Sequence, residues 1–167
     1  MSCLGVHFAL TPEDAQALEA IENDDDRLEH LTEEIEERYF KEAEAYIAES
    51  DKSWDAMHRA LSDGTLSSSG GSFPLNHVVL GGTSLYADDD YIMSLKTPVQ
   101  VRDIAAALAP VDEAEFRRLY NNIDAEDYDG EVSDEDFEYT WGWFTGVRDL
   151  YVKAAAEGRF VLFTADQ

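Results

Sequence analysis

The sequence is poor in the features that secreted, membrane-bound and disulfide-stabilised proteins need. Cys3 is the only cysteine in 167 residues, which excludes an internal disulfide and is typical of a reducing compartment. No apolar run approaches the ~20 residues of a membrane span. The first residues, "MSCLGVHFAL", lack the basic segment of a signal peptide. We therefore expect a cytoplasmic protein without a membrane anchor.

Basic side chains are also scarce, with 12 lysines and arginines against 37 acids and a formal net charge of −25. Residues 12–51 hold sixteen acids and three bases, and residues 112–138 hold twelve acids and two bases. Nucleic acids and anionic membranes are bound by clustered Lys and Arg, so neither is expected as a partner. Two interpretations of the acidic surface stay open: a solvated, solubilising surface, or a face that binds a basic partner protein.

The chain does contain short β-branched runs and segments of helical periodicity. Strands are predicted at 3–10, 77–82, 91–95 and 159–165, and helices at 12–21, 33–49, 54–64, 98–110, 116–123 and 134–157. Asp51 is expected to cap the helix that begins at Trp54. No linker or repeat divides residues 1–167. We expect one α+β domain, a small sheet of about four strands packed against a helical layer with a long aromatic C-terminal helix.

The stretch "SWDAMHRAL" raises the main question about a site. Trp54, Met57, His58 and Leu61 fall at i, i+3, i+4 and i+7, so one helix face carries all four. That face either lines a ligand cleft or belongs to the core. The core interpretation places Trp54 with the aromatic residues of the long C-terminal helix.

A cleft would join this helix to the end of the strand predicted at 77–82. Its candidate ligand-binding residues are Trp54, His58, His77, Gly81 and Gly82. His58 is the candidate catalytic residue, because a histidine beside a carboxylate is a common general base. A single histidine on an apolar stripe is also a common core residue, and the glycines also fit a plain turn.

The loop at residues 125–136 weakly resembles a calcium-binding loop. Asp127, Asp129 and Asp136 occupy ligand positions, but Ala125 stands at the first position and offers no side-chain oxygen. An acidic turn that caps the following helix explains the pattern equally well. The histidines lack the spacing of a zinc site. We expect no metal and no cofactor.

Several landmarks together resemble the YfbM-like family of small bacterial proteins. The most specific is Asp-Lys-x-Trp-x-x-x-His, here Asp51, Lys52, Trp54 and His58, followed by the Gly81–Gly82 pair at the end of "FPLNHVVLGG". "TPVQVRDIAAAL" and "YVKAAAEGRFVLF" fit as well, so the resemblance covers essentially the whole chain. It implies a single α+β domain of uncharacterised function and brings no reaction, cofactor or catalytic residue with it.

Two functions remain. The first is a non-enzymatic binding or regulatory module whose acidic surface meets a basic protein, since no complete catalytic constellation is visible. The alternative is a small-molecule-binding protein or hydrolase with the cleft described above. The sequence does not decide whether the protein is an enzyme.

Overall fold

Five antiparallel strands form one sheet in the order β2-β1-β5-β4-β3 in the computed structural model, which describes residues 3–167. The strands are β1 (Gly5–Leu10), β2 (Ile47–Asp51), β3 (Thr83–Ser84), β4 (Tyr91–Lys96) and β5 (Phe160–Asp166). The first and last strands of the chain therefore lie side by side at the centre of the sheet, with His7 opposite Phe163. The prediction of a closing strand at 159–165 is confirmed.

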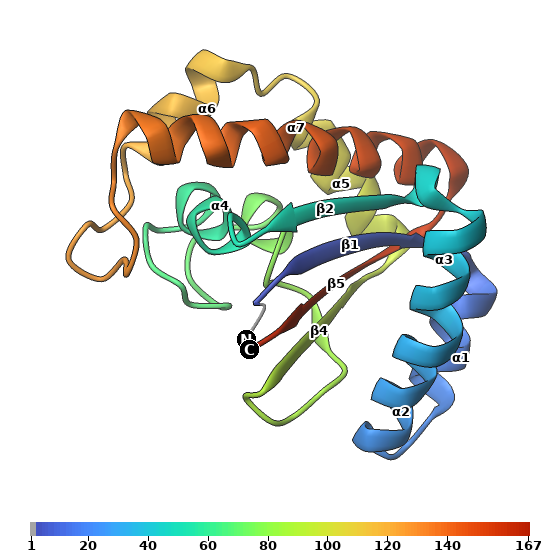
Figure 1. The fold of residues 1–167 in the computed structure, drawn as a ribbon. Helices are drawn as coiled ribbons and strands as arrows, with labels where there is room; N and C mark the ends of the chain where they lie inside the picture. Colours follow the sequence, from blue (N-terminus) through green and yellow to red (C-terminus); the bar gives the residue numbers. More distant parts are fainter. Residues whose placement is uncertain (1–2) are drawn as a thin grey trace.

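Helices cover both faces of this sheet (Figure 1). One face is covered by α1 (Pro12–Ala20), α2 (Asp24–His30), the π-helix η1 (Leu31–Glu36) and α3 (Glu37–Glu42). On the other face lie α4 (Trp54–Leu61), α5 (Pro98–Leu108), α6 (Glu113–Tyr120) and the long α7 (Asp134–Glu157). The 3₁₀ turns η2 (Glu44–Tyr46) and η3 (Leu75–His77) complete the elements. No helix within residues 3–167 is both long and apolar enough to cross a membrane.

The strands other than the two-residue β3 contribute alternate residues to two separate cores, because side chains point to opposite faces in turn. The α1–α3 face is built on Phe8, Leu10, Met93, Leu95 and Leu162. The α7 face is built on Ala9, Val161 and Phe163 together with the apolar side chains of α4 to α7. The sheet is thus the middle layer of three, and the α+β class is confirmed with five strands.

The helix ends follow the sequence signals. Thr11, Thr97 and Ser133 accept hydrogen bonds at the starts of α1, α5 and α7, and Thr97 forms a full capping box with Gln100. Gly158 ends α7 in the left-handed conformation at φ 67°. The long aromatic C-terminal helix was predicted correctly at both ends.

The helix predicted at 33–49 is wrong at both ends. The helical segment begins at Asp24, where Asn23 supplies the cap, and it ends at Glu42. Residues 47–51 form β2 and pair with β1. Ile47 lies at the spacing expected for the apolar face of a helix. In the structure, however, Ala48 and Ser50 are buried and Glu49 between them is exposed, which is the alternation of a strand. Pairing with the edge of β1 outweighs the local helical preference.

Two further expectations about local structure are wrong. His77 is the last residue of η3, and residues 78–82 form a turn and a bend and not a strand. Asp51 does not cap α4, because Ser53 is the N-cap residue. Asp51 instead ends β2 at φ 49° and its carboxylate accepts a 2.7 Å hydrogen bond from the Tyr139 hydroxyl of α7.

Candidate functional site

Buried side chains hold the segment Val78–Gly81, which would otherwise leave its carbonyls unpaired in the core. The Val78 carbonyl accepts hydrogen bonds from His7 Nε2 and from the Tyr151 hydroxyl, both at 2.7 Å. His7 is fully buried, and this burial together with the nearby Lys96 lowers its pKa to about 3. The imidazole is therefore neutral and donates from Nε2.

The next three carbonyls are bound from strand β4. Lys96 Nζ donates to the Val79 carbonyl at 2.6 Å. The Ser94 hydroxyl lies 3.0 Å from the carbonyls of both Leu80 and Gly81. Side-chain donors thus replace the hydrogen bonds of a strand ladder, which explains why this apolar run does not need to be a strand.

Lys96 occupies a position that lysine rarely takes, because it is fully buried without an acidic partner. Apart from the Val79 carbonyl, its amine has polar contacts of 3.3 Å with the backbone oxygen and the hydroxyl of Ser94. The Phe163 ring centroid lies 5.7 Å away. No carboxylate within residues 3–167 pairs with the amine. Burial lowers the pKa of Lys96 well below its ordinary value.

Beside this segment lies a cavity of about 590 Å³, the Trp54 cavity. Its walls come from α4, the loop after it, the turn at 80–82, the loop at 86–89 and β4; they include Trp54, Leu66, Leu80, Gly81, Gly82 and Ser94. A volume of this size is in the range of small-molecule sites. Three of the five residues expected to bind a ligand therefore share one cavity.

Trp54 belongs to the core and to the cavity at once. Only 5% of the residue is exposed, and its ring centroid lies 5.7 Å from that of Phe163. The indole N–H donates to the Cys3 carbonyl at 2.8 Å. Trp54 is part of the same buried cluster as Phe144 of α7, as expected from the sequence.

His58 is not among the residues that line the cavity. It is fully buried, and its Nε2 lies 2.7 Å from the Ser67 carbonyl. Desolvation lowers the pKa of His58. The neighbouring Asp55 accepts a 2.5 Å hydrogen bond from Arg59 and does not orient the imidazole. The expected carboxylate–histidine unit is not formed in this arrangement.

His77 is also separate from the cavity lining. Its Nδ1 lies 2.7 Å from the Asn76 side-chain oxygen, and the Phe73 ring meets it edge-on at 4.8 Å. Gly81 does line the cavity, and a Cβ there would lie 2.4 Å from the Asn76 carbonyl. The glycine is needed for this close backbone approach.

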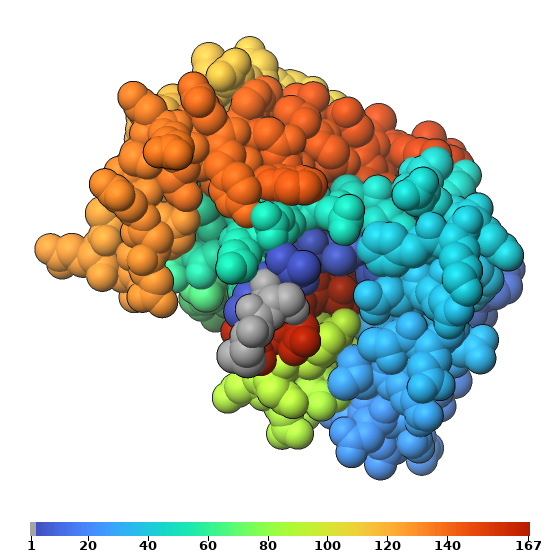
Figure 2. All heavy atoms as spheres, viewed as in Figure 1, coloured from blue at the N-terminus to red at the C-terminus, as the bar shows by residue number. Residues whose placement is uncertain are grey.

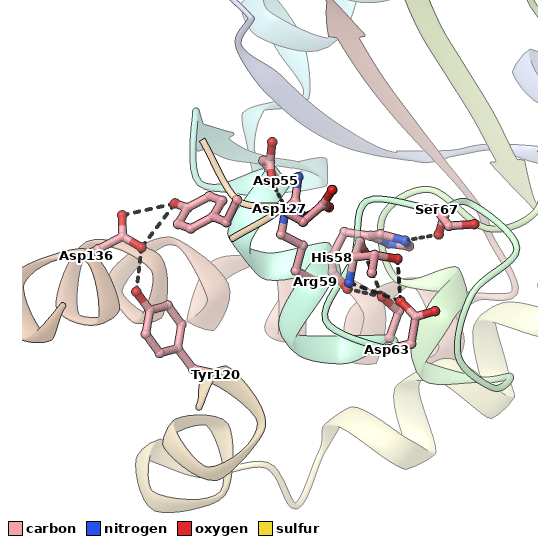
Figure 3. Close-up of polar contacts among 11 residues, drawn as sticks. Asp55, His58, Arg59, Asp63, Ser67, Tyr120, Asp127 and Asp136 are labelled. Carbon is pink, nitrogen blue, oxygen red and sulfur yellow. Dashed lines mark hydrogen bonds and ion pairs between the residues drawn. The ribbon is translucent and has the colours of Figure 1, made fainter. Parts of the chain in front are cut away.

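Two of the three carboxylates of the calcium-like loop, those of Asp127 and Asp136, accept hydrogen bonds from other side chains (Figure 3). Asp136 accepts hydrogen bonds from the hydroxyls of Tyr120 at 2.6 Å and Tyr128 at 3.1 Å. Asp127 accepts from Arg59 at 2.6 Å, and Asp129 is exposed. In the part of the chain that the structure describes, no group of three or more potential ligands is placed to bind a metal ion.

A second concavity, the acidic hollow, opens where β1, β2, β4 and β5 meet the helical segment η1–α3 (Figure 2). It has a volume of about 280 Å³. Its lining combines apolar side chains with three carboxylates and two hydroxyl groups: Leu4, Val6, Phe40 and Tyr91, then Glu36, Glu49 and Asp166, then Thr32 and Thr164. Burial raises the pKa of Glu36, so this carboxyl is partly desolvated before any ligand arrives.

Sequence reasoning missed Ser94 and Lys96 beside the Trp54 cavity and the residues that line the acidic hollow. Ser94 and Lys96 alternate with Met93 and Leu95 in β4, so the inward spacing of the polar pair is visible in the sequence. From the sequence alone, a lysine at the end of a predicted strand is expected to be exposed to solvent. Its burial can be inferred only when it is known that other elements cover that face of the sheet. The acidic hollow is lined by segments far apart in the chain, so no local sequence pattern indicates it.

The arrangement defines a three-layer α+β domain with two candidate ligand sites. The chain belongs to the domain of unknown function DUF1877, whose family model matches residues 1–164. Among solved structures it is similar to YfbM from Escherichia coli, a protein of unknown function, with a TM-score of 0.65 and 20% identity over 97% of this chain and 99% of that one. No curated protein matches the chain. The likeness to YfbM shows the fold, and the resemblance inferred from the sequence is confirmed.

Proposed function

We propose that the protein is a binding or regulatory module that receives a basic segment of a partner protein at the acidic hollow. The observation that carries this proposal is the composition of the hollow. Glu36, Glu49 and Asp166 come from three different elements and surround exposed apolar side chains, and the lining contains no lysine or arginine.

This lining complements a long basic side chain. Leu4 and Phe40 are 45% and 36% exposed, and they offer contact to the aliphatic stem of a lysine or arginine. The surrounding carboxylates meet its charged end, and a guanidinium or ammonium would compensate the partial desolvation of Glu36. The excess of acids over the whole chain, 37 against 12 bases, favours rapid encounter with such a partner.

Affinity capture from native lysate with a neutralised hollow tests the proposal. The variant carries Glu36→Gln, Glu49→Gln and Asp166→Asn. We expect the unmodified protein to retain a specific basic protein at low and moderate salt, and the variant to lose it. Recovery of the same partner by both proteins would contradict the assignment to the hollow.

A matched control separates the hollow from general acidity. The control carries Glu126→Gln, Asp129→Asn and Glu131→Gln, three exposed acids of the loop before α7. It has the same change in charge and should keep the partner, because simple charge attraction depends on the total charge while a site depends on position.

A second function is favoured by the Trp54 cavity. We infer that this cavity binds a small molecule, since it has a volume of about 590 Å³ and one of its walls belongs to a segment that four buried side chains hold in place. A preformed wall lowers the entropic cost of binding. Thermal-shift screening of neutral, cationic and anionic metabolites should yield a ligand that raises the melting temperature. A Leu80→Trp variant that fills the cavity should lose the response, and an unchanged response would place the ligand elsewhere.

A further inference from the structure

Ser94 and Lys96 combine a hydroxyl on the wall of the Trp54 cavity with an amine buried behind it. Both side chains leave β4 on the α7 face, two residues apart. The amine nitrogen lies 3.3 Å from the Ser94 hydroxyl oxygen. Ser94 lines the cavity, whereas Lys96 is completely covered. A substrate in the cavity would meet the hydroxyl first, with the amine next to it.

The hydrogen-bonding partners of this pair allow the Lys96 amine to accept a hydrogen bond from the Ser94 hydroxyl. A neutral amine has two hydrogens and one lone pair, and the backbone oxygens of Val79 and Ser94 can take the two hydrogens. The lone pair then remains for the hydrogen of the Ser94 hydroxyl. In the resting arrangement that hydrogen points to the carbonyls of Leu80 or Gly81, and rotation about the Cβ–Oγ bond turns it to the amine.

We propose that Ser94 and Lys96 form a nucleophile and general-base pair that hydrolyses small esters bound in the Trp54 cavity. The inference rests on the second proposed function, because it needs a ligand in that cavity. Burial without an acidic partner favours the neutral amine, which is the form that accepts a proton. Serine–lysine pairs are an established chemical alternative to serine–histidine pairs.

The reaction balances with water as the only other reactant. Ser94 Oγ bonds to the ester carbonyl carbon while Lys96 takes the hydroxyl proton, and the C=O electron pair moves to oxygen. The tetrahedral intermediate then breaks the bond to the alcohol oxygen, which takes the proton from Lys96 and leaves as the alcohol. Water repeats the sequence on the acyl-serine: Lys96 accepts its proton, the acid is released and the proton returns to Ser94.

The cavity also restricts which ester can enter. Its lining includes Asp88 and Asp89 and contains no lysine or arginine, so anionic substrates are disfavoured and uncharged or cationic ones are accepted. Leu66 and Ile92 provide apolar contact for a short acyl chain. Ser84 lies opposite Ser94 in the β3–β4 pairing and lines the same cavity, where its hydroxyl donates to the Tyr86 carbonyl at 2.9 Å.

Covalent labelling with a fluorophosphonate tests the nucleophile, and turnover of p-nitrophenyl acetate tests the reaction. We expect one adduct per chain, mapped to Ser94 by mass spectrometry, and none in Ser94→Ala. Lys96→Met should slow both labelling and turnover about 100-fold, the usual contribution of a general base. Ser72→Ala and Lys41→Met, at exposed positions outside the cavity, should keep the full rates.

The pH dependence gives a readout that a merely structural lysine would not affect. The labelling rate of the unmodified protein should rise with pH and level off well below pH 10.5, as Lys96 loses its proton. This measurement needs no variant, so it stands even if Lys96→Met folds poorly. A folded protein without an adduct on Ser94, or a folded Lys96→Met that is labelled at the full rate, would overturn the proposal.

Failure of this inference can be told apart from failure of the cavity itself. Ser94→Ala should still show the thermal shift of a cavity ligand, because His7, Tyr151 and Lys96 continue to bind the carbonyls of Val78 and Val79. A ligand that binds while no ester is cleaved would refute the pair and leave the binding function intact. A protein that neither binds nor cleaves would refute both.

Discussion

The two faces of the sheet are buried to a similar degree but by different means. The α1–α3 face is apolar along the central strands, with Phe8, Leu10, Leu95 and Leu162 all at most 2% exposed. The α7 face has polar side chains at the matching positions of the same strands, namely His7, Ser94 and Lys96, at most 4% exposed. The difference follows from what covers each face: regular helices on one, and partly the irregular segment Val78–Gly81 on the other.

Helices satisfy their own backbone groups, so the side chains beneath them can be purely apolar. An irregular segment leaves its carbonyls to be satisfied from outside, and a buried carbonyl without a donor costs about 1–3 kcal/mol. The polar residues of the α7 face are therefore required by the backbone they hold. The same requirement creates a rigid wall beside the Trp54 cavity.

Moving a lysine from one face to the other should have the largest effect. Leu95 is 2% exposed and belongs to the apolar cluster beneath α1–α3, one residue before Lys96. Leu95→Lys would bury an amine where no run of free carbonyls receives it. We expect a loss of more than about 4 kcal/mol at pH 7, a large share of the roughly 5–15 kcal/mol by which native domains are stable. Urea denaturation or, failing that, the absence of soluble folded protein measures it.

The tolerance of Lys96 in the neighbouring position is the internal control for this change. If Leu95→Lys folds with nearly unchanged stability, then the two faces do not differ in the way described. The α7 face would then be no better suited to a buried lysine than the α1–α3 face.

Replacing Trp54 by alanine should give the next largest effect. The residue is 5% exposed in the α7-face cluster, and its removal leaves the Cys3 carbonyl without the indole N–H donor. We expect Trp54→Ala to cost on the order of 3–5 kcal/mol in chemical denaturation. Because the side chain also lines the cavity, Trp54→Phe should retain most of the stability. A loss below about 1 kcal/mol for Trp54→Ala would show that the residue belongs to the cavity and contributes little to the core.

Acid should destabilise the α7 face through His7. The unfolded imidazole has the ordinary value near 6.5, whereas the folded one has a pKa of about 3. Between these values the unfolded state binds the extra proton, so stability is lost as pH falls from 6.5 towards 3, by about 1.4 kcal/mol per pH unit. The lowered pKa values of His58 and His77 act in the same direction.

His7→Gln isolates this contribution, because the glutamine amide can still donate to the Val78 carbonyl. The variant should lose stability less steeply than the unmodified protein in urea titrations at pH 6, 5 and 4. The many surface carboxylates contribute equally to both proteins and cancel in the difference. Equal slopes would mean that His7 is not held neutral in the fold.

The sequence predicted the class, the single domain and the elements whose signals are local. Thr11, Thr97 and Ser133 mark helix starts because their side chains accept N-cap hydrogen bonds. Gly158 marks a helix end because glycine readily adopts the left-handed conformation. These signals act within one turn of the chain. They survive in the fold because nothing distant competes with them.

The failures all involve partners far along the chain. Ile47–Asp51 becomes a strand because β1 offers an edge, about forty residues away. The apolar run at 77–82 is not a strand because His7, Ser94, Lys96 and Tyr151 bind the carbonyls of its residues 78–81. Neither partnership can be read from a local period. The candidate site was found in part. Trp54 and the glycine pair belong to local sequence patterns, whereas the role of Ser94 and Lys96 depends on the distant turn whose carbonyls they bind.

Removing the buried amine should have the smallest effect at neutral pH and a clear effect at alkaline pH. Lys96→Met leaves the Val79 carbonyl without its donor, which costs about 1–3 kcal/mol, but it also removes the cost of burying an amine that is charged in the unfolded chain at pH 7. We expect these terms to cancel to within about 1 kcal/mol.

Because the pKa of Lys96 is lowered by folding, the unfolded state binds more protons up to about pH 10.5, so the unmodified protein should gain stability from pH 7 to pH 10. Lys96→Met should lack that gain in urea titrations at the two pH values, whereas Lys41→Met, at an exposed site, should retain it. A gain of the same size in Lys96→Met would show that the amine stays charged in the fold, which would also remove the general base from the proposed reaction.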